Sequence, residues 1–371
     1  MRDLGLYLHI PFCSAKCSYC DFFSFSGMEH LFEPYVNRLL SELSSAEISD
    51  TTTVYVGGGT PTALTASLLY KVLTSVSELP LAQDVEFTIE INPGTVDRDY
   101  LQLIKSTGVN RISFGLQSTC NSELSLIGRI HTYEQFKENY LCAKDIGFCN
   151  INVDLMFGLP NQAVFDFEKT LLAILSLRPQ HLSFYSLTPS EGTPFWSYLT
   201  SGRFTLPDDD VDRNMYHLAS DFLTKFGYNH YEISNAALPG YECIHNTNCW
   251  QHKPYLGFGL GASSFDGQKR WNNPSNFEDY LSGVKPEIQL LSEEDLISEA
   301  MMLGLRMLGG IDEFLFESVY RIKPSLFFSE QIDKLVSNGL IECNSNRIRL
   351  TSLGLDLANQ VFMSFLQEAK S

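Results

Sequence analysis

Apolar stretches of strand length alternate with helical stretches along the first half of the chain. The predicted strands cover residues 4–10, 53–56, 85–91, 111–114, 150–156 and 181–187. The predicted helices cover residues 31–44, 66–78, 97–107, 133–146 and 165–176. Six strands linked by five helices predict a parallel sheet with right-handed crossovers. Eight such units close a full barrel, so six predict an α/β fold with a partial (β/α)6 barrel whose open side admits a large substrate.

Polar motifs follow the predicted strands where each strand ends. The motifs, in strand order, are the loop around Cys13, the run Gly57-Gly-Gly-Thr60-Pro-Thr, Glu90, Gln117 and Asp154. Because the carboxyl ends of parallel barrel strands form the face that carries chemistry, five separate segments are expected to converge on one rim.

Each motif taken alone also has a structural interpretation. The glycine run fits a tight turn, although glycine also lets backbone N–H groups approach a bound anion such as a carboxylate. Glu90 and Asp154 each lie inside an apolar strand, where a charge is costly unless it meets a partner or faces a cavity. Both a structural role and a binding role stay open for these carboxylates.

The most informative spacing is C-x3-C-x2-C, formed by Cys13, Cys17 and Cys20. Three thiolates on one short loop can hold three irons of a [4Fe–4S] cluster and leave the fourth iron open. An open iron can bind a substrate or cofactor, whereas electron-transfer clusters are normally closed by four cysteines. Position 22, where a C-x-C continuation would fall, is Phe22.

Two alternatives compete with a cluster. The three thiols could coincide by chance in a chain of nine cysteines, but the other six show no comparable clustering. A zinc site lacks a nearby fourth ligand in C-x2-C or H-x3-H spacing.

The cysteine spacing resembles the signature of the radical S-adenosylmethionine (SAM) superfamily. That resemblance implies that SAM chelates the open iron through its amino and carboxylate groups, and that reduction of the cluster cleaves SAM to a 5′-deoxyadenosyl radical. The protein would position SAM and tune the cluster.

Further motifs narrow the likeness to the oxygen-independent coproporphyrinogen III oxidase group. These motifs are Tyr7-Leu-His-Ile-Pro-Phe-Cys13, Gly57-Gly-Gly-Thr-Pro-Thr62, Glu90-Ile-Asn-Pro-Gly94, Arg111-Ile-Ser-Phe-Gly-Leu-Gln117-Ser, Gly128-Arg129-Ile-His131 and Asp154-Leu-Met-Phe-Gly-Leu-Pro160. The resemblance implies that Tyr7 lies beside SAM and that Gly58, Gly59 and Thr60 contact it. It also implies that the polar groups of SAM are held by Glu90, Gln117, Arg129 and Asp154. Without the other motifs, Arg129 would be interpreted as a solvent-exposed charge on a loop.

The group contains true oxidases (HemN type), which decarboxylate porphyrinogen propionates, and haem chaperones (HemW type), which deliver haem to acceptor proteins. The oxidases continue the cysteine motif with another cysteine, where this chain has Phe22, and carry an extension before the first strand. The segment His245-Asn-Thr-Asn-Cys249-Trp250 resembles the H-N-x-x-Y-W motif of the chaperones. The chaperone interpretation is favoured, and the oxidase is the alternative.

The H-N-x-x-Y-W likeness implies that His245 ligates haem iron, a role that suits neutral imidazole. Trp250 could pack its aromatic face against a porphyrin. An ordinary loop histidine and a core tryptophan are the alternative. Cys249 stands where the family has tyrosine, and Ser263 replaces the family's usual histidine in the following glycine-rich segment.

After Pro286 the pattern changes to helices near residues 293–307, 315–319 and 329–338, followed by a strand, polar turn and strand ending at Leu350. This order resembles a winged-helix module like the family's C-terminal domain. DNA binding is disfavoured because no strong basic run is present, so a lid or docking surface is expected. The predicted domains are a barrel at 1–230, a haem-motif and glycine-rich connecting segment at 231–285, and a C-terminal HemN-like domain at 286–371.

Charge and composition add a cellular context. The net charge of −18 argues against a nucleic-acid surface and favours solubility. Neither a secretory signal nor an apolar run of membrane-spanning length is visible, so a cytoplasmic location is expected, which suits free thiols. The expected cofactors are a [4Fe–4S] cluster, SAM and haem. The expected partners are haem-acceptor proteins, membrane-associated ones among the candidates.

Overall fold

The computed structural model describes residues 3–366, and its central sheet follows the predicted alternation. The six strands are β1 (Leu4–Ile10), β2 (Thr51–Gly58), β3 (Leu81–Ile91), β4 (Arg111–Gln117), β5 (Asn150–Phe157) and β6 (His181–Ser186). Each strand pairs in parallel with the next one along the chain. The predicted α/β class with a partial parallel barrel is confirmed.

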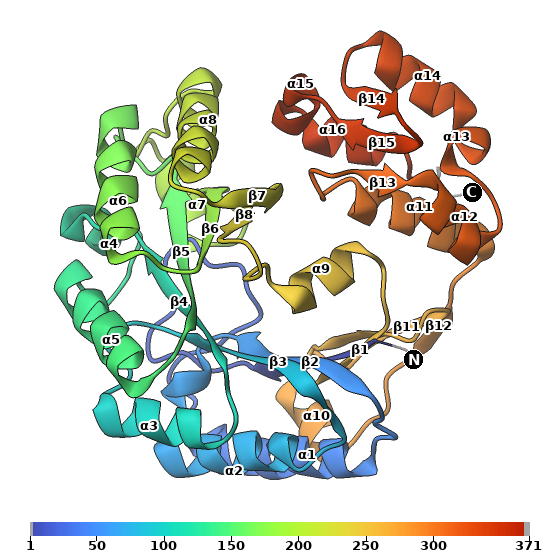
Figure 1. Ribbon diagram of the computed structural model, residues 1–371. Helices are drawn as coiled ribbons and strands as arrows, with labels where there is room; N and C mark the ends of the chain where they lie inside the picture. Colours follow the sequence, from blue (N-terminus) through green and yellow to red (C-terminus); the bar gives the residue numbers. More distant parts are fainter. Residues whose placement is uncertain (1–2, 367–371) are drawn as a thin grey trace.

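Five helices return the chain between these strands and cover the outer face of the curved sheet (Figure 1). They are α1 (Phe32–Ser45), α2 (Ala66–Ser77), α3 (Arg98–Ser106), α5 (Tyr133–Ile146) and α6 (Val164–Leu177). Their apolar sides pack into one core with the strands. Local signals set the ends of α5, because Thr132 and Gln135 form a capping box and Gly147 ends the helix at φ +100°.

The sheet extends beyond the six predicted strands at both edges. At one edge, β9 (Tyr255–Phe258) pairs in parallel with β1 and leads to β10 (Ser263–Phe265), β11 (Lys269–Asn272) and β12 (Ile288–Leu290). At the other edge, β8 (Asn235–Ala237) and β7 (Asn229–Glu232) continue from β6. Strands of three or four residues are too short for alternation to reveal, which is why the sequence did not predict them.

The remaining helices of the barrel region lie in its connections. They are η1 (Glu29–Leu31), η2 (Pro61–Ala63), α4 (Asn121–Leu126), α7 (Pro194–Thr200), α8 (Asp209–Lys225), α9 (Ile244–Trp250) and α10 (Phe277–Ser282). Figure 1 shows α9 inside the curve of the sheet, between the strands and the C-terminal domain.

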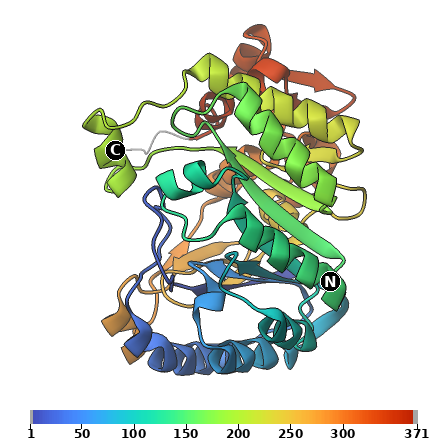
Figure 2. The same cartoon turned by 90° about the vertical axis from the view of Figure 1, so that its left-hand side faces the viewer.

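The C-terminal domain has a hydrophobic core of its own. Its elements are α11 (Glu293–Gly304), β13 (Ile311–Asp312), α12 (Glu313–Tyr320), α13 (Pro324–Phe327), α14 (Ser329–Ser337), β14 (Ile341–Asn344), β15 (Arg347–Leu350), α15 (Ser352–Asp356) and α16 (Ala358–Met363). The predicted hairpin is β14–β15, turned by Ser345 and Asn346 at positive φ, and β13 adds a third strand. Figure 2 shows this domain at the opposite side of the molecule from α1.

The helices of residues 3–366 include none that is both long and apolar enough to cross a membrane.

Candidate functional site

The carboxyl ends of the barrel strands and the cysteine loop surround one cavity of about 350 Å³. Ten of the predicted site residues line it: Cys13, Cys17, Cys20, Gly58, Gly59, Thr60, Glu90, Gln117, Arg129 and Asp154. The expected convergence on one rim is therefore what the structure shows. The individual roles of these residues stay predictions.

Backbone hydrogen bonds hold the cysteine loop in place. Cys13 N donates to Phe25 O at 2.8 Å, and Cys20 N donates to Cys17 O at 3.2 Å. Lys16 Nζ binds the carbonyl oxygens of Phe22 and Ser24, both at 3.0 Å. Phe22 is 66% exposed and lies at the edge of the cavity.

Two side chains donate to the thiols. Thr60 Oγ1 lies 3.6 Å from Cys13 Sγ, and Arg129 Nη1 lies 3.4 Å from Cys17 Sγ. Burial raises the pKa of the Cys13 and Cys20 thiols, so nearby donors and iron would be needed to favour thiolates. No three His, Cys, Asp or Glu side chains among the described residues are placed to hold one metal ion. A [4Fe–4S] cluster places each thiolate on a different iron, so it does not require that closeness.

The glycine run packs directly against the cysteine loop. Gly59 N donates to Ile10 O at 2.9 Å and Thr60 N to Phe12 O at 2.7 Å. A Cβ on Gly59 would lie 2.6 Å from Phe12 O, and Gly58 has φ +113°. Glycine is therefore required by the turn itself, and the same turn presents its backbone to the cavity.

Glu90 and Asp154 face the cavity without an ion pair among the described residues. Glu90 accepts hydrogen bonds from Tyr55 Oη at 2.8 Å and Gly58 N at 3.1 Å, yet burial raises its pKa to about 7. Asp154 accepts one from Asn152 Nδ2 at 2.7 Å, and burial raises its pKa too. Two desolvated carboxyl groups at one cavity suit a ligand that brings cationic and hydroxyl groups.

Asn92, which sequence reasoning did not assign, joins the two donors to the thiols. Its Nδ2 donates to Thr60 Oγ1 at 2.6 Å, and its Oδ1 accepts from Arg129 Nη2 at 2.8 Å. The signal was present, since Asn92 lies inside the quoted run that begins at Glu90. Tyr185, also unassigned, donates to Gln117 Oε1 at 3.0 Å, and Gln117 has φ +79°, which orients its amide at the rim.

Two predicted residues lie outside this cavity. Tyr7 is inside the barrel, where its hydroxyl bonds His9 Nδ1 at 2.9 Å. His245 is only 6% exposed, and its Nδ1 bonds Thr53 Oγ1 at 2.9 Å. Burial lowers the pKa of His245 to about 4, so the imidazole is neutral.

Helix α9 closes the end of the barrel opposite the cysteine loop. Glu86, which pairs in register with Thr53, accepts hydrogen bonds from the backbone N–H groups of Ile244 and His245, both at 2.9 Å. Glu86 and Glu90 are four residues apart on β3, which separates them by about 13 Å. The histidine motif and the cysteine loop therefore occupy different ends of one barrel.

The structure does not bring His245 and Trp250 to one surface. Five residues of α-helix turn by about 140°, so the two side chains leave α9 on different sides. The His245 ring lies 5.3 Å from the Tyr55 ring inside the barrel. The Trp250 ring instead faces Arg306 of the C-terminal domain, whose Cζ is 4.2 Å from the ring centroid.

Comparisons with known proteins agree with the site. Residues 7–174 match the Radical SAM superfamily, and residues 291–357 match the HemN C-terminal domain. The chain is 37% identical to the heme chaperone HemW of Lactococcus lactis, over 97% of this chain and 96% of that protein. It is 34% identical to HemW of Bacillus subtilis, over 98% and 99% of the two chains.

A solved structure agrees at the level of the fold. Coproporphyrinogen III oxidase (HemN) from Escherichia coli superposes with a TM-score of 0.84 at 24% identity, over 98% of this chain and 90% of that one. The relatives and the cavity residues together identify the protein family. The chain belongs to the HemW family of the Radical SAM superfamily.

Proposed function

We propose that this chain is a haem chaperone that carries a [4Fe–4S] cluster and SAM, binds haem and delivers it to acceptor proteins in the cytoplasm. The observation that carries the proposal is the nearly full-length match to relatives named HemW. The cytoplasm suits free thiols. The acceptors are proteins that receive haem, and membrane-associated proteins are among the candidates.

The cavity residues fit the proposed cofactors. Cys13, Cys17 and Cys20 would each bind one iron of the cluster. The backbone at Gly58 to Thr60 would approach SAM, and the unpaired carboxyl groups of Glu90 and Asp154 would receive its ammonium and hydroxyl groups. When bound, the reduced cluster supplies an electron to SAM.

The haem ligand is proposed to be His245, with a condition set by its surroundings. His245 is held by Thr53 and its ring packs beside that of Tyr55, so α9 must move before the imidazole can reach an iron. Cys249 is the next candidate, because four residues of helix place it about 40° from His245. Burial raises the pKa of the Cys249 thiol to about 11, which disfavours thiolate ligation.

A radical SAM oxidase acting on coproporphyrinogen III is the second candidate, favoured by the fold likeness to HemN. Anaerobic incubation of the reconstituted protein with SAM and coproporphyrinogen III distinguishes the two. We expect no decarboxylated product but a Soret band on titration with haem. Formation of protoporphyrinogen would overturn the chaperone proposal.

Three variants test the ligand. His245→Ala should lose the wild-type Soret spectrum, whereas His30→Ala, at an exposed histidine, should keep it. Thr53→Val removes the bond that holds His245 and should preserve or tighten haem binding. Wild-type affinity and spectrum in folded His245→Ala protein would assign the iron to another residue.

A further inference from the structure

On the side of α9 that faces the C-terminal domain, an arginine covers the Trp250 ring. Arg306, which follows α11, lies over the Trp250 indole, 4.2 Å from guanidinium carbon to ring centroid. Its Nη2 is also 3.7 Å from Glu232 Oε2, and Glu232 is fully buried. The aromatic face that would pack against a porphyrin is therefore occupied within the protein itself.

This contact leaves several buried polar atoms without a hydrogen bond. Among residues 3–366, Trp250 Nε1, Arg306 Nε and Glu232 Oε2 have no hydrogen-bond partner, and neither does Ser298 Oγ on α11. Buried polar atoms in native proteins are normally paired, and unpaired ones cost the free energy of their lost hydration. Opening this interface would hydrate them, so the closed arrangement is less stable than its many contacts suggest.

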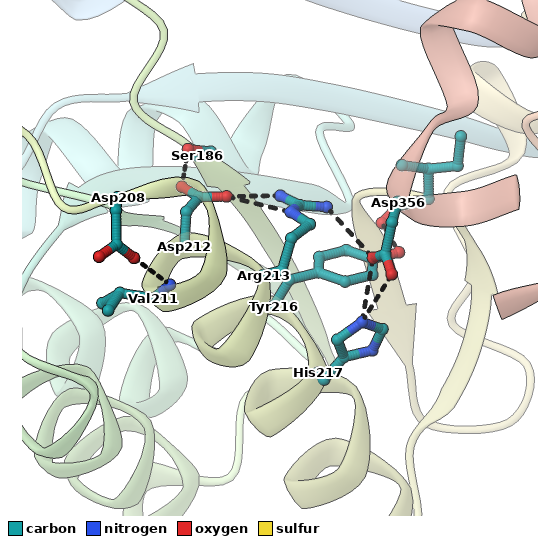
Figure 3. Close-up of polar contacts among 9 residues, drawn as sticks. Ser186, Asp208, Val211, Asp212, Arg213, Tyr216, His217 and Asp356 are labelled. Carbon is teal, nitrogen blue, oxygen red and sulfur yellow. Dashed lines mark hydrogen bonds and ion pairs between the residues drawn. The ribbon is translucent and has the colours of Figure 1, made fainter. Parts of the chain in front are cut away.

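Other polar contacts also join the barrel region to the C-terminal domain. Glu299 on α11 pairs with Arg270 on β11 and with His252, which lies two residues after α9. A further contact is more exposed and better suited to opening. Asp356 at the end of α15 lies 3.0 Å from His217 Nε2 and 3.8 Å from Arg213 Nη1, both on α8 (Figure 3). All three side chains are partly exposed, so water and salt weaken these contacts.

Backbone pairing supplies a place about which the domain can turn. Ile233 N donates to Arg306 O at 3.1 Å, and Leu308 N donates to Tyr231 O at 3.0 Å. These bonds tie the segment after α11 to β7 without using the Arg306 side chain. The side chain can leave the indole while the backbone pairing stays intact.

We propose that haem enters between α9 and the C-terminal domain, and that Arg306 is the latch that keeps this entrance closed over Trp250. The proposal rests on the haem-chaperone function above. In the closed state α9 is clamped, with His245 inside the barrel and Trp250 under Arg306. Release of the latch exposes the indole for stacking and removes one of the contacts that hold α9. His245 can then turn outward by giving up its bonds to Thr53 and Glu86.

The test uses the full-length protein with Trp250 as its single tryptophan, made by Trp196→Phe and Trp271→Phe. Arg306→Met keeps a long side chain but removes the cation, and Arg306→Met with Glu232→Gln also removes the carboxylate left behind. Arg347→Met is the matched control, because Arg347 pairs with Asp312 inside the C-terminal domain. Acrylamide quenching of Trp250 reports opening without haem, and stopped-flow absorbance reports haem association.

Both Arg306 variants should raise quenching several-fold and speed haem association about tenfold, since loss of a partly buried cation–π contact raises the open population by roughly that factor. The control should match the parent protein. Unchanged quenching of Trp250 would refute the latch. Stronger quenching with unchanged or slower haem association would also refute it. A parent protein that binds no haem would instead refute the chaperone function, while quenching would still test the latch.

Discussion

Replacing Glu90 with glutamine should stabilise the protein at high pH while weakening SAM binding. Burial raises the Glu90 pKa from an ordinary 4.5 to about 7. A raised carboxyl pKa means that folding favours the protonated form. The stability present below pH 4.5 is therefore lost as pH rises to 7, and it stays lost above that value.

The size of the effect follows from the two pKa values. Each pKa unit is worth about 1.4 kcal/mol. Ionisation of Glu90 in the folded protein therefore lowers the free energy of unfolding by about 3.4 kcal/mol at pH 8.5 and by about 1.4 kcal/mol at pH 5.5. Glutamine cannot ionise, but it fits the donors Tyr55 and Gly58 less well, which costs about 1 kcal/mol at either pH. The difference in unfolding free energy between Glu90→Gln and wild type should therefore shift in favour of the variant by about 2 kcal/mol when the pH is raised from 5.5 to 8.5.

Urea unfolding of the cluster-free protein under reducing, anaerobic conditions at the two pH values measures this difference. Glu78→Gln, at an exposed carboxylate after α2, should change stability by less than about 0.5 kcal/mol at both. Equilibrium dialysis of reconstituted protein should show weaker SAM binding by Glu90→Gln with the iron content unchanged. If Glu90→Gln were equally destabilised at both pH values, Glu90 would be an ionised, stabilising group and the reasoning would be wrong.

Three further variants test the rest of the framework. Alanine at Cys13, Cys17 and Cys20 together should abolish the visible absorption of the reconstituted cluster, and retention of four irons would contradict the assignment. Gly59→Ala places a Cβ 2.6 Å from Phe12 O, so iron incorporation and SAM binding should both fall; normal values of both would show that the turn can adjust. Glu86→Gln removes the charge that accepts the first N–H groups of α9 and should cost about 1 kcal/mol in urea unfolding, with no loss expected if α9 is held by its side chains alone.

The sequence predicted the parts of the fold that depend on local pattern. Strand β1 and helix α5 have the predicted bounds, because alternation and caps are written in neighbouring residues. The convergence of Gly58, Glu90 and Asp154 on one cavity also followed, since carboxyl ends of parallel strands share an edge.

Contacts between distant segments were not predictable in the same way. Strand β9 pairs with β1 through residues about 250 positions apart, and its four residues carry no pattern of their own. The position of His245 depends on Thr53 and Glu86, which lie 192 and 159 residues away in the chain. A motif identifies which residue type occurs at a position. The burial of that residue depends on which distant segments the fold packs against it.

The separation of the two motifs bears on which chemistry the barrel can perform. An oxidase must bring its porphyrinogen to the SAM cavity, because the reacting carbon has to lie beside the cofactor. Haem held at α9 would instead lie at the other end of the barrel, beyond the level of Glu86 on β3. The side chain of Tyr55 lies between the two ends, with its hydroxyl on Glu90 and its ring beside His245. One barrel can therefore hold a reactive cofactor at one end and haem at the other without giving them a common cavity, which is the arrangement expected of a carrier that must release its porphyrin unchanged.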